Sequence, residues 1–262
     1  MGIGVDVVEV KEARFSAKVL LSVPFVLASI VMVLWLSWQL LSALNFSYPL
    51  WYRVLHIPAH IEKYAPQNSI RKDFSNTTAE ERYRLFGEVV DAINSGGEGL
   101  AEIEYHDVNG VVIDTMYTES EVLHLQDVAN LITAFDYLSY FAILVVIGYS
   151  IRYLGYWGGA PIKPNWRALH AAVAGLLLAC VAIIFVIGPK EVFYFAHRTI
   201  FPPDHPWLFY YQESLMSTSM KAPDLFGGLA VEWLLFALTG YYLWIYFFGY
   251  LIKRRIREQE NR

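Results

Sequence analysis

The side chains in this sequence best suited to proton transfer are its seven histidines, because an imidazole gains and loses a proton near neutral pH. A lone histidine near a membrane interface is more often a satisfied polar anchor than a catalyst, so each one must be judged by its neighbours. Six of them fall in two segments that separate long apolar runs: His56, His60, His106, His124, His197 and His205.

Two spacings would bring polar side chains together. His124 precedes Asp127 by three residues on a predicted helix, which places both on one face. His56 and His60 have the four-residue spacing of metal ligands, but Pro58 weakens a regular helix between them. Because no cysteine or His-Glu-x-x-His pattern accompanies them, we expect no zinc site and no other metal or cofactor.

The remaining polar residues have plainer interpretations. His106 falls in a predicted hairpin and is expected at the surface, and His205 stands between Asp204 and Pro206 in a predicted turn. Asp136 and Glu232 lie inside apolar runs, where an acid is a functional candidate by default. Each is near the end of its run, so a structural hydrogen bond is an equal alternative.

Covalent catalysis has no support in the sequence. It contains no Gly-x-Ser-x-Gly elbow and no phosphate-binding glycine loop. The single cysteine, Cys180, lies within an apolar run, where its thiol is expected to stay inert. One cysteine also excludes an intramolecular disulfide and a multi-cysteine metal site.

The composition indicates an integral membrane protein. Of the 262 residues 56% are hydrophobic and 17% charged, a more apolar balance than soluble domains have. The net charge of −5 gives no basic face for nucleic acid. Four runs are long enough to cross a bilayer as helices, at about 19–44, 131–151, 168–187 and 229–252.

Basic residues predict the orientation of these spans. The Lys and Arg residues cluster before the first span, between the second and third, and after the fourth, which places both termini in the cytoplasm. The members of these clusters are Lys11, Arg14 and Lys18, then Arg152, Lys163 and Arg167, then Lys253, Arg254, Arg255 and Arg257. We therefore expect one integral membrane domain, 1–262, with an extracytoplasmic cap at 45–128 and a second outer segment at 189–228.

The cap is predicted to be a small α+β unit. A capping box at Thr78–Glu81 opens a helix that ends near 94–97, and Asn109-Gly110 indicates a type I′ hairpin. A second box at Thr118–Glu121 opens a helix expected to run unbroken into the second span. The second outer segment is rich in aromatics and proline, and its apolar part, 208–220, is too short to span, which suits an interfacial or re-entrant element.

One stretch resembles the signature of a known family. Glu121-Val-Leu-His124-Leu-Gln-Asp127-Val is similar to the Glu-x-x-His-Met-x-Asp-Val-Lys motif of the bacterial lipoprotein intramolecular transacylases (Lit), with Ala129 in place of the lysine. Arg82-Tyr83-Arg84 resembles the cap helix of that family. His197-Arg-Thr-Ile-Phe201, with the later Trp207 and Pro223, resembles its second signature.

The resemblance implies an acyl shift within one lipid-modified protein. The sn-2 acyl chain of a diacylglyceryl group would move to the α-amino group of the N-terminal cysteine, giving a lyso-form lipoprotein. The partners would be diacylglyceryl-modified bacterial lipoproteins and membrane lipid, with no nucleic acid. The reaction would take place on the extracytoplasmic side of the bacterial cytoplasmic membrane.

Site roles follow from the same resemblance. His124 would be the general base, with Glu121 or Asp127 orienting its ring, and His197 would bind the oxyanion or protonate the departing oxygen; these two roles can be exchanged. The residues expected to contact substrate are Phe201, Trp207, Arg198 and Tyr83.

Three alternatives remain at this stage. A sensor or assembly partner could bind another protein through the cap and would need no histidine chemistry. A metal-dependent lipid hydrolase would use His56, His60 and nearby acids and would be inhibited by a chelator. A transporter is disfavoured, because four spans without paired interrupted helices show little internal symmetry.

Overall fold

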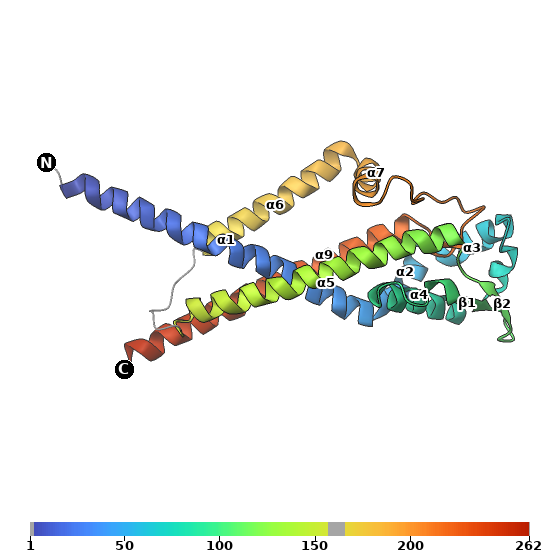
Figure 1. The fold of residues 1–262 in the computed structure, drawn as a ribbon, viewed down its shortest axis with the longest axis horizontal. Helices are drawn as coiled ribbons and strands as arrows, with labels where there is room; N and C mark the ends of the chain where they lie inside the picture. Colours follow the sequence, from blue (N-terminus) through green and yellow to red (C-terminus); the bar gives the residue numbers. More distant parts are fainter. Residues whose placement is uncertain (1–2, 157–165, 262) are drawn as a thin grey trace. The chain divides into compact units, whose positions relative to one another are not determined.

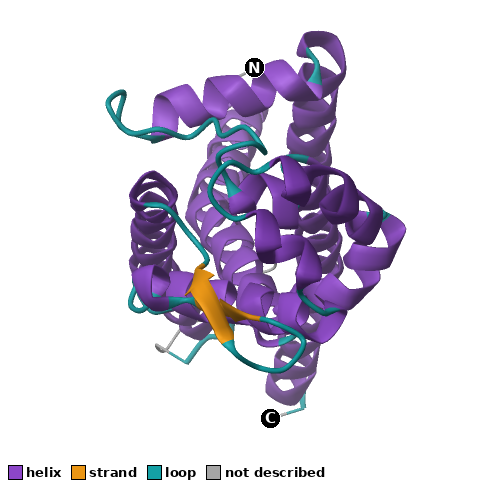
Figure 2. Cartoon of the chain, turned by 90° about the vertical axis from the view of Figure 1, so that its right-hand side faces the viewer, coloured by secondary structure: helices purple, strands orange, loops and turns teal. Residues whose placement is uncertain are grey.

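The computed structural model describes residues 3–156 and 166–261, and the side chains of 22–156 and 171–261. The described chain is mainly helical, with one two-stranded sheet (Figures 1 and 2). Lys163 lies outside the described residues, as do the side chains of Lys11, Arg14, Lys18, Arg167 and His170. The longer elements are α1 (Ile3–Ala43), α2 (Tyr48–Val54), α3 (Ile57–Tyr64), α4 (Ala79–Asn94), β1 (Glu104–His106), β2 (Val112–Thr115), α5 (Glu119–Tyr153), α6 (Trp166–Ile187), α7 (Pro189–Ile200), α8 (Leu215–Ser219) and α9 (Asp224–Glu260).

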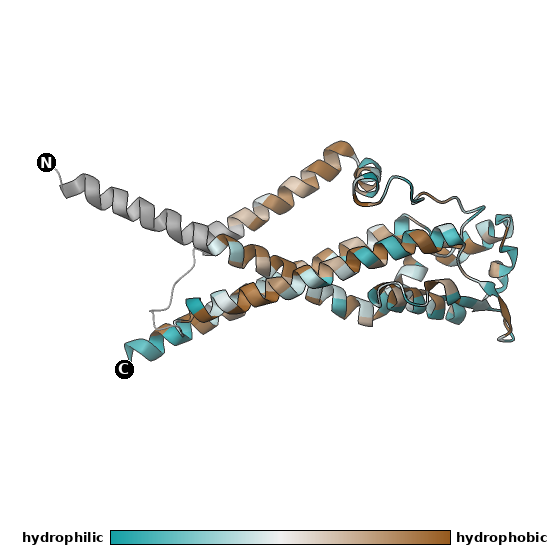
Figure 3. Ribbon diagram, in the orientation of Figure 1, coloured by the Kyte–Doolittle hydropathy of each residue, from teal (hydrophilic) through white to brown (hydrophobic). Residues whose placement is uncertain are grey.

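Three described helices are long and apolar enough to cross a membrane, and a fourth span is possible. The three are Ser22–Ala43 of α1, α5 and α9. The described part of the run predicted at 168–187, Ala171–Ile187, is apolar enough together with α7, which it meets at an angle of 105°. Gly188, with φ +94°, lies at this bend, and Pro189 begins the next helix. Figure 3 shows the apolar character of α6.

The chain divides into two compact units, each with its own core. The first comprises Met1–Trp35, Tyr137–Phe193 and Ala237–Arg262. Its core includes the rings of Phe25, Tyr153 and Phe248, which contact one another within 6.1 Å between centroids. The apolar side chains of α6 are mostly exposed, as expected for a helix that faces lipid.

The second unit comprises Leu36–Asp136 and Tyr194–Phe236, and it contains most of the polar contacts described below. Its core is built around stacked Tyr48 and Phe86, whose ring centroids lie 4.0 Å apart. α4 begins where predicted, because Thr78 Oγ1 accepts a hydrogen bond from the Glu81 amide. It ends where the left-handed Gly97 donates to the Ala92 carbonyl.

The predicted hairpin is present, but its turn is of another type. β1 and β2 pair antiparallel with a bulge between Tyr105 and His106. Only Gly110 of the predicted pair has positive φ, whereas a type I′ turn needs it at both central residues. Asp107 explains the difference, because its carboxylate accepts hydrogen bonds from the amides of Asn109 and Val111 and fixes a longer loop.

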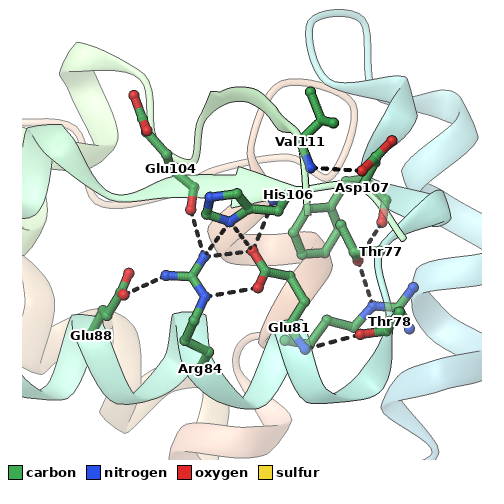
Figure 4. Close-up of polar contacts among 11 residues, drawn as sticks. Thr77, Thr78, Glu81, Arg84, Glu88, Glu104, His106, Asp107 and Val111 are labelled. Atoms are coloured by element: carbon green, nitrogen blue, oxygen red, sulfur yellow. Dashed lines mark hydrogen bonds and ion pairs between the residues drawn. The ribbon is translucent and has the colours of Figure 1, made fainter. Parts of the chain in front are cut away.

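His106 is half-buried in an ion cluster and is not the free surface residue that the sequence suggested. Its ring and its amide both lie within 2.9 Å of a Glu81 oxygen, and Arg84 contacts Glu81, Glu88 and His106 (Figure 4). Burial raises the pKa of Glu81, but the hydrogen bonds from Arg84 and His106 outweigh burial and lower that pKa to about 2. The cluster joins α4 to β1 and is structural.

Both acids within the apolar runs accept hydrogen bonds from neighbours. Asp136 accepts one from Gln39 Nε2 at 3.3 Å. Glu232 accepts two, from Ser47 Oγ at 2.7 Å and from Trp51 Nε1 at 2.8 Å. The carboxylate on α9 therefore holds the turn into α2, which supports the structural alternative for these residues.

The Trp51 ring packs directly on the backbone of α9 at Gly228. A Cβ added at Gly228 would lie 2.8 Å from this ring. We expect Gly228→Ala to lower the free energy of unfolding by about 1–3 kcal/mol, because the indole must shift and strain its bond to Glu232. Thermal unfolding in detergent measures the change.

Gly227→Ala is the matched control, since nothing lies within 4 Å of a Cβ at Gly227. That variant gains helix propensity and is expected to be stabilised by about 0.5–1 kcal/mol. Equal melting temperatures for the two variants would contradict the close packing at Gly228.

Candidate active site

Two histidines that lie far apart in the sequence meet in the second unit. His124 is on the second turn of α5, which runs unbroken from Glu119 as predicted, and His197 is near the end of α7. Their ring centroids are 6.1 Å apart, and the ring planes are inclined at 30°. Both residues belong to the same compact unit, so the packing of that unit sets this distance.

Aromatic rings surround the histidine pair. Phe201 contacts both histidines, at 4.9 Å from His124 and 5.2 Å from His197 between centroids. Trp207 lies 5.1 Å from His197, and Phe209 lies 5.9 Å from His124. The structure thus brings Phe201 and Trp207 to the histidines, and their contact with substrate stays a prediction. Phe209 was missed, because a phenylalanine in an apolar run carries no signal of its own.

The imidazole of His124 is buried, with an exposed fraction of 7%. Its Nδ1 atom has no hydrogen-bond partner among the described residues. Buried polar atoms of folded proteins are nearly always paired, so this nitrogen has no protein partner that would compete with a water or a substrate group. His197 is half-buried beside it.

Glu121 is fully buried one turn before His124, and its carboxylate has other partners. One oxygen accepts from the amide and the hydroxyl of Thr118, at 2.9 and 2.8 Å, which completes the predicted capping box. The other accepts from Ser214 Oγ at 2.6 Å and the Met216 amide at 3.0 Å. Glu121 therefore ties the start of α5 to the start of α8.

Asp127 also has a partner other than His124. Its Oδ2 lies 2.6 Å from Nδ1 of His205, which donates the hydrogen bond. The His205 amide donates a hydrogen bond to the Pro202 carbonyl, so the predicted turn is present in the backbone. The contact of the His205 side chain with Asp127 was not predicted. The contact holds the segment after α7 against α5. This segment carries Phe201, Trp207 and Phe209.

The other predicted residues are dispersed. Arg198 is exposed, and its Nε donates to the Tyr194 carbonyl within α7. Tyr83 packs against Tyr48 and Tyr52 in the cap core. The ring contacts of the histidine pair do not include Tyr83, so a substrate contact for it stays a prediction.

The two histidines of the metal-dependent alternative do not both lie inside one regular helix. His56 has left-handed φ and caps the start of α3, whereas His60 lies one turn inside that helix. Burial lowers the pKa of His60, which favours a neutral ring that packs 4.6 Å from Tyr64. Within the described residues, no three His, Cys, Asp or Glu side chains form a group that could hold a metal ion.

The contact between His205 and Asp127 is expected to restrain the aromatic segment. Replacing His205 by alanine removes a short hydrogen bond to a mostly buried carboxylate, worth about 1.5–3 kcal/mol. We expect amide hydrogen exchange at the non-proline positions of this segment, 204, 205, 207 and 208, to become roughly ten- to a hundredfold faster.

His205→Gln keeps an N–H donor and should recover part of the protection, and Asp204→Asn in the same turn should have no effect. Unchanged exchange in His205→Ala would show that the contact does not order the segment.

The apolar helices and the histidine pair define an integral membrane protein with a candidate acid–base site. The model of one family, Lipoprotein intramolecular transacylase Lit, matches residues 23–216, about three quarters of the chain. The chain belongs to this family and is an acyltransferase. This membership supports an enzyme over a sensor. Curated proteins give no match.

Solved structures of another protein have a fold similar to that of this chain. The chain is similar to in meso structures of the membrane-integral lipoprotein intramolecular transacylase Lit from Bacillus cereus. One gives a TM-score of 0.65 at 17% identity, covering 95% of this chain and 98% of that chain. Another gives a TM-score of 0.63 at 17% identity, covering 92% of this chain and 98% of that chain. At this identity the likeness concerns the fold alone.

Proposed function

We propose that this acyltransferase moves the sn-2 acyl chain of a diacylglyceryl group to the α-amino group of the N-terminal cysteine of the same lipoprotein. The product is an N-acyl, S-monoacylglyceryl lipoprotein. The observation that carries the proposal is the histidine pair, with ring centroids 6.1 Å apart among aromatic side chains. Two imidazoles can serve the two proton positions of such an exchange.

The reaction needs one proton to move from nitrogen to oxygen. The neutral amine attacks the ester carbonyl carbon while His124 takes its proton, and His197 donates a hydrogen bond to the oxyanion. The ester C–O bond then breaks, the glycerol oxygen takes the proton that His124 accepted, and an amide and a free sn-2 hydroxyl remain. No water is consumed. The two histidines can exchange roles without changing this balance.

Donor and acceptor belong to one molecule, so positioning supplies much of the rate. A well-oriented intramolecular reaction can gain about 7–11 kcal/mol from proximity alone. The rings of Phe201 and Trp207 would hold the substrate beside the histidines, and the exposed Arg198 would meet polar groups of the lipid. Glu121 and Asp127 support the site by fixing the segments around it.

We place the site on the extracytoplasmic side of a bacterial cytoplasmic membrane. Lys253, Arg254, Arg255 and Arg257 follow the apolar part of α9, and such residues favour the cytoplasm. With four spans, both termini would lie in the cytoplasm. Reporter fusions at the C-terminus and within 98–111 should give cytoplasmic and extracytoplasmic signals respectively, and the reverse would overturn this placement.

The test is expression in a bacterium that makes only diacyl lipoproteins, followed by mass spectrometry of their N-terminal peptides. An intramolecular shift leaves the peptide mass unchanged and places one acyl group on nitrogen, which fragment ions reveal. Loss of one acyl mass would indicate a hydrolase. A gain of one acyl mass would indicate transfer from a separate lipid, and either result would overturn the proposal.

A further inference from the structure

The second unit contains a cavity of about 280 Å³ that no step above uses. Its walls come from the end of α1, from α4, α5 and α9, and from Phe46 and Met220. We call it the apolar chamber. An engineered apolar cavity of about 150 Å³ stays dry and binds benzene, so the chamber has room for a longer hydrocarbon.

The chamber offers no unpaired polar side chain to a ligand. Thirteen of its fourteen lining residues are apolar, and Asn94 is the exception. Its amide is occupied at both ends, because Trp38 Nε1 donates to its oxygen at 2.9 Å and its nitrogen donates to the Val90 carbonyl at 2.7 Å. A water, peptide or lipid headgroup would lose its hydrogen bonds there, whereas a hydrocarbon would lose none.

Two lining residues of the chamber are neighbours of His124 on α5. Leu125 follows His124 directly, and Val128 lies one turn further on the same face of α5 as His124. On the opposite wall, α9 contributes Phe226 and Ala230, which are both exposed enough for a ligand to reach. A chain whose ester lies at His124 would therefore have only the length of about one turn of α5 to cover to reach a lining residue of the chamber.

We propose that the apolar chamber binds the acyl chain that is transferred, with the ester at the histidine pair and the distal methylenes between α5 and α9. The proposal rests on the proposed function, and it names the part of the substrate that the protein positions. Because the chain comes from a bilayer and not from water, moving it into protein gains little hydrophobic free energy. The chamber acts by fixing the ester against His124, so its loss should lower kcat more than it raises KM.

The test fills the chamber at its accessible wall. Ala230→Phe adds a ring at a lining position, and Val231→Phe is the control, because Val231 is 55% exposed and does not line the chamber. Both full-length variants are assayed in nanodiscs with synthetic lipopeptides that carry a palmitoyl or a butyryl chain at sn-2.

For the palmitoyl substrate, kcat of Ala230→Phe should fall by roughly ten- to a hundredfold, the range that a small misplacement costs. For the butyryl substrate, which is too short to fill the chamber, kcat should change less than about twofold. Val231→Phe should match the wild type on both. If the ratio of kcat for the palmitoyl substrate to kcat for the butyryl substrate is the same in Ala230→Phe and Val231→Phe, the proposal is overturned. If Ala230→Phe does not fold, Ala230→Leu serves in its place.

A second measurement needs no turnover. A lipopeptide with a diazirine in the distal part of its sn-2 chain is photolysed with the His124→Ala protein, in which turnover is expected to be slow, and the labelled peptides are mapped. Labels on the segments of Val89, Val128 and Phe226, reduced in Ala230→Phe, support the chamber even if no acyl shift is ever observed. Labels elsewhere overturn it and leave the proposed function standing. Equal labelling by a phospholipid with the same chain would assign the chamber to bulk lipid and overturn it as well.

Discussion

Alanine at His124 or at His197 is expected to lower the rate of acyl transfer by about two to four orders of magnitude, the usual contribution of a positioned acid or base. The double variant should be no slower than about the worse single variant, because the two rings act on one proton transfer and their effects are not additive. The rate is measured with the synthetic lipopeptide, and unfolding temperatures show that each variant is folded.

Conservative variants separate the roles of the two rings. His124→Phe keeps the packing on Phe201 and removes both nitrogens, so it should be as slow as His124→Ala if proton transfer is the role. His197→Gln keeps a hydrogen-bond donor, so it should retain more activity than His197→Ala if His197 binds the oxyanion. His56→Ala is the control, because His56 is exposed at the start of α3. Normal lyso-form product from either histidine variant would remove that residue from the mechanism.

Glu121→Ala is expected to destabilise the second unit by on the order of 3–5 kcal/mol. The carboxylate is fully buried and accepts four hydrogen bonds, two from Thr118 and one each from Ser214 and Met216. Removing it leaves buried donors unpaired, which costs more than the bonds themselves contribute. Activity should fall with stability, because the segment before Ser214 carries Phe209 to His124.

Glu119→Ala is the matched control for this variant, since Glu119 is an exposed acid in the same helical turn. Glu121→Gln keeps one acceptor oxygen and should fall between the two. Thermal unfolding and hydrogen exchange at 214–219 measure the effect. If Glu121→Ala unfolds at the same temperature as Glu119→Ala, the Glu121 carboxylate does not hold α8 to α5.

Local signals predicted the elements of the fold well. The capping residues Thr78 and Thr118 begin helices where expected, because a side-chain oxygen that accepts from an amide three residues later is a short-range device. The hairpin was placed correctly, and its turn type was wrong, because the carboxylate of Asp107 competes locally with the Asn-Gly preference. The run at 168–187 was predicted as a simple span, and the bend at Gly188 joins it to α7.

The partners of the acids could not be predicted in this way. The family resemblance implied that Asp127 or Glu121 orients His124, whereas in the structure Asp127 bonds to His205 and Glu121 to Ser214. Each bond joins residues more than 75 positions apart, at 78 and 93. Their geometry depends on how the segment after α7 folds back, and no periodicity in the sequence encodes that path.

The sequence by itself determined that this is a helical membrane protein of the lipoprotein transacylase family, because apolar runs, caps and a signature motif are properties of neighbouring residues. Only the tertiary structure decided that His124 and His197 meet, that Phe209 packs on His124, and that the second unit contains an apolar chamber. These features arise where segments distant in the chain pack together. Their positions follow from the shape of the whole core, which no single stretch of sequence specifies.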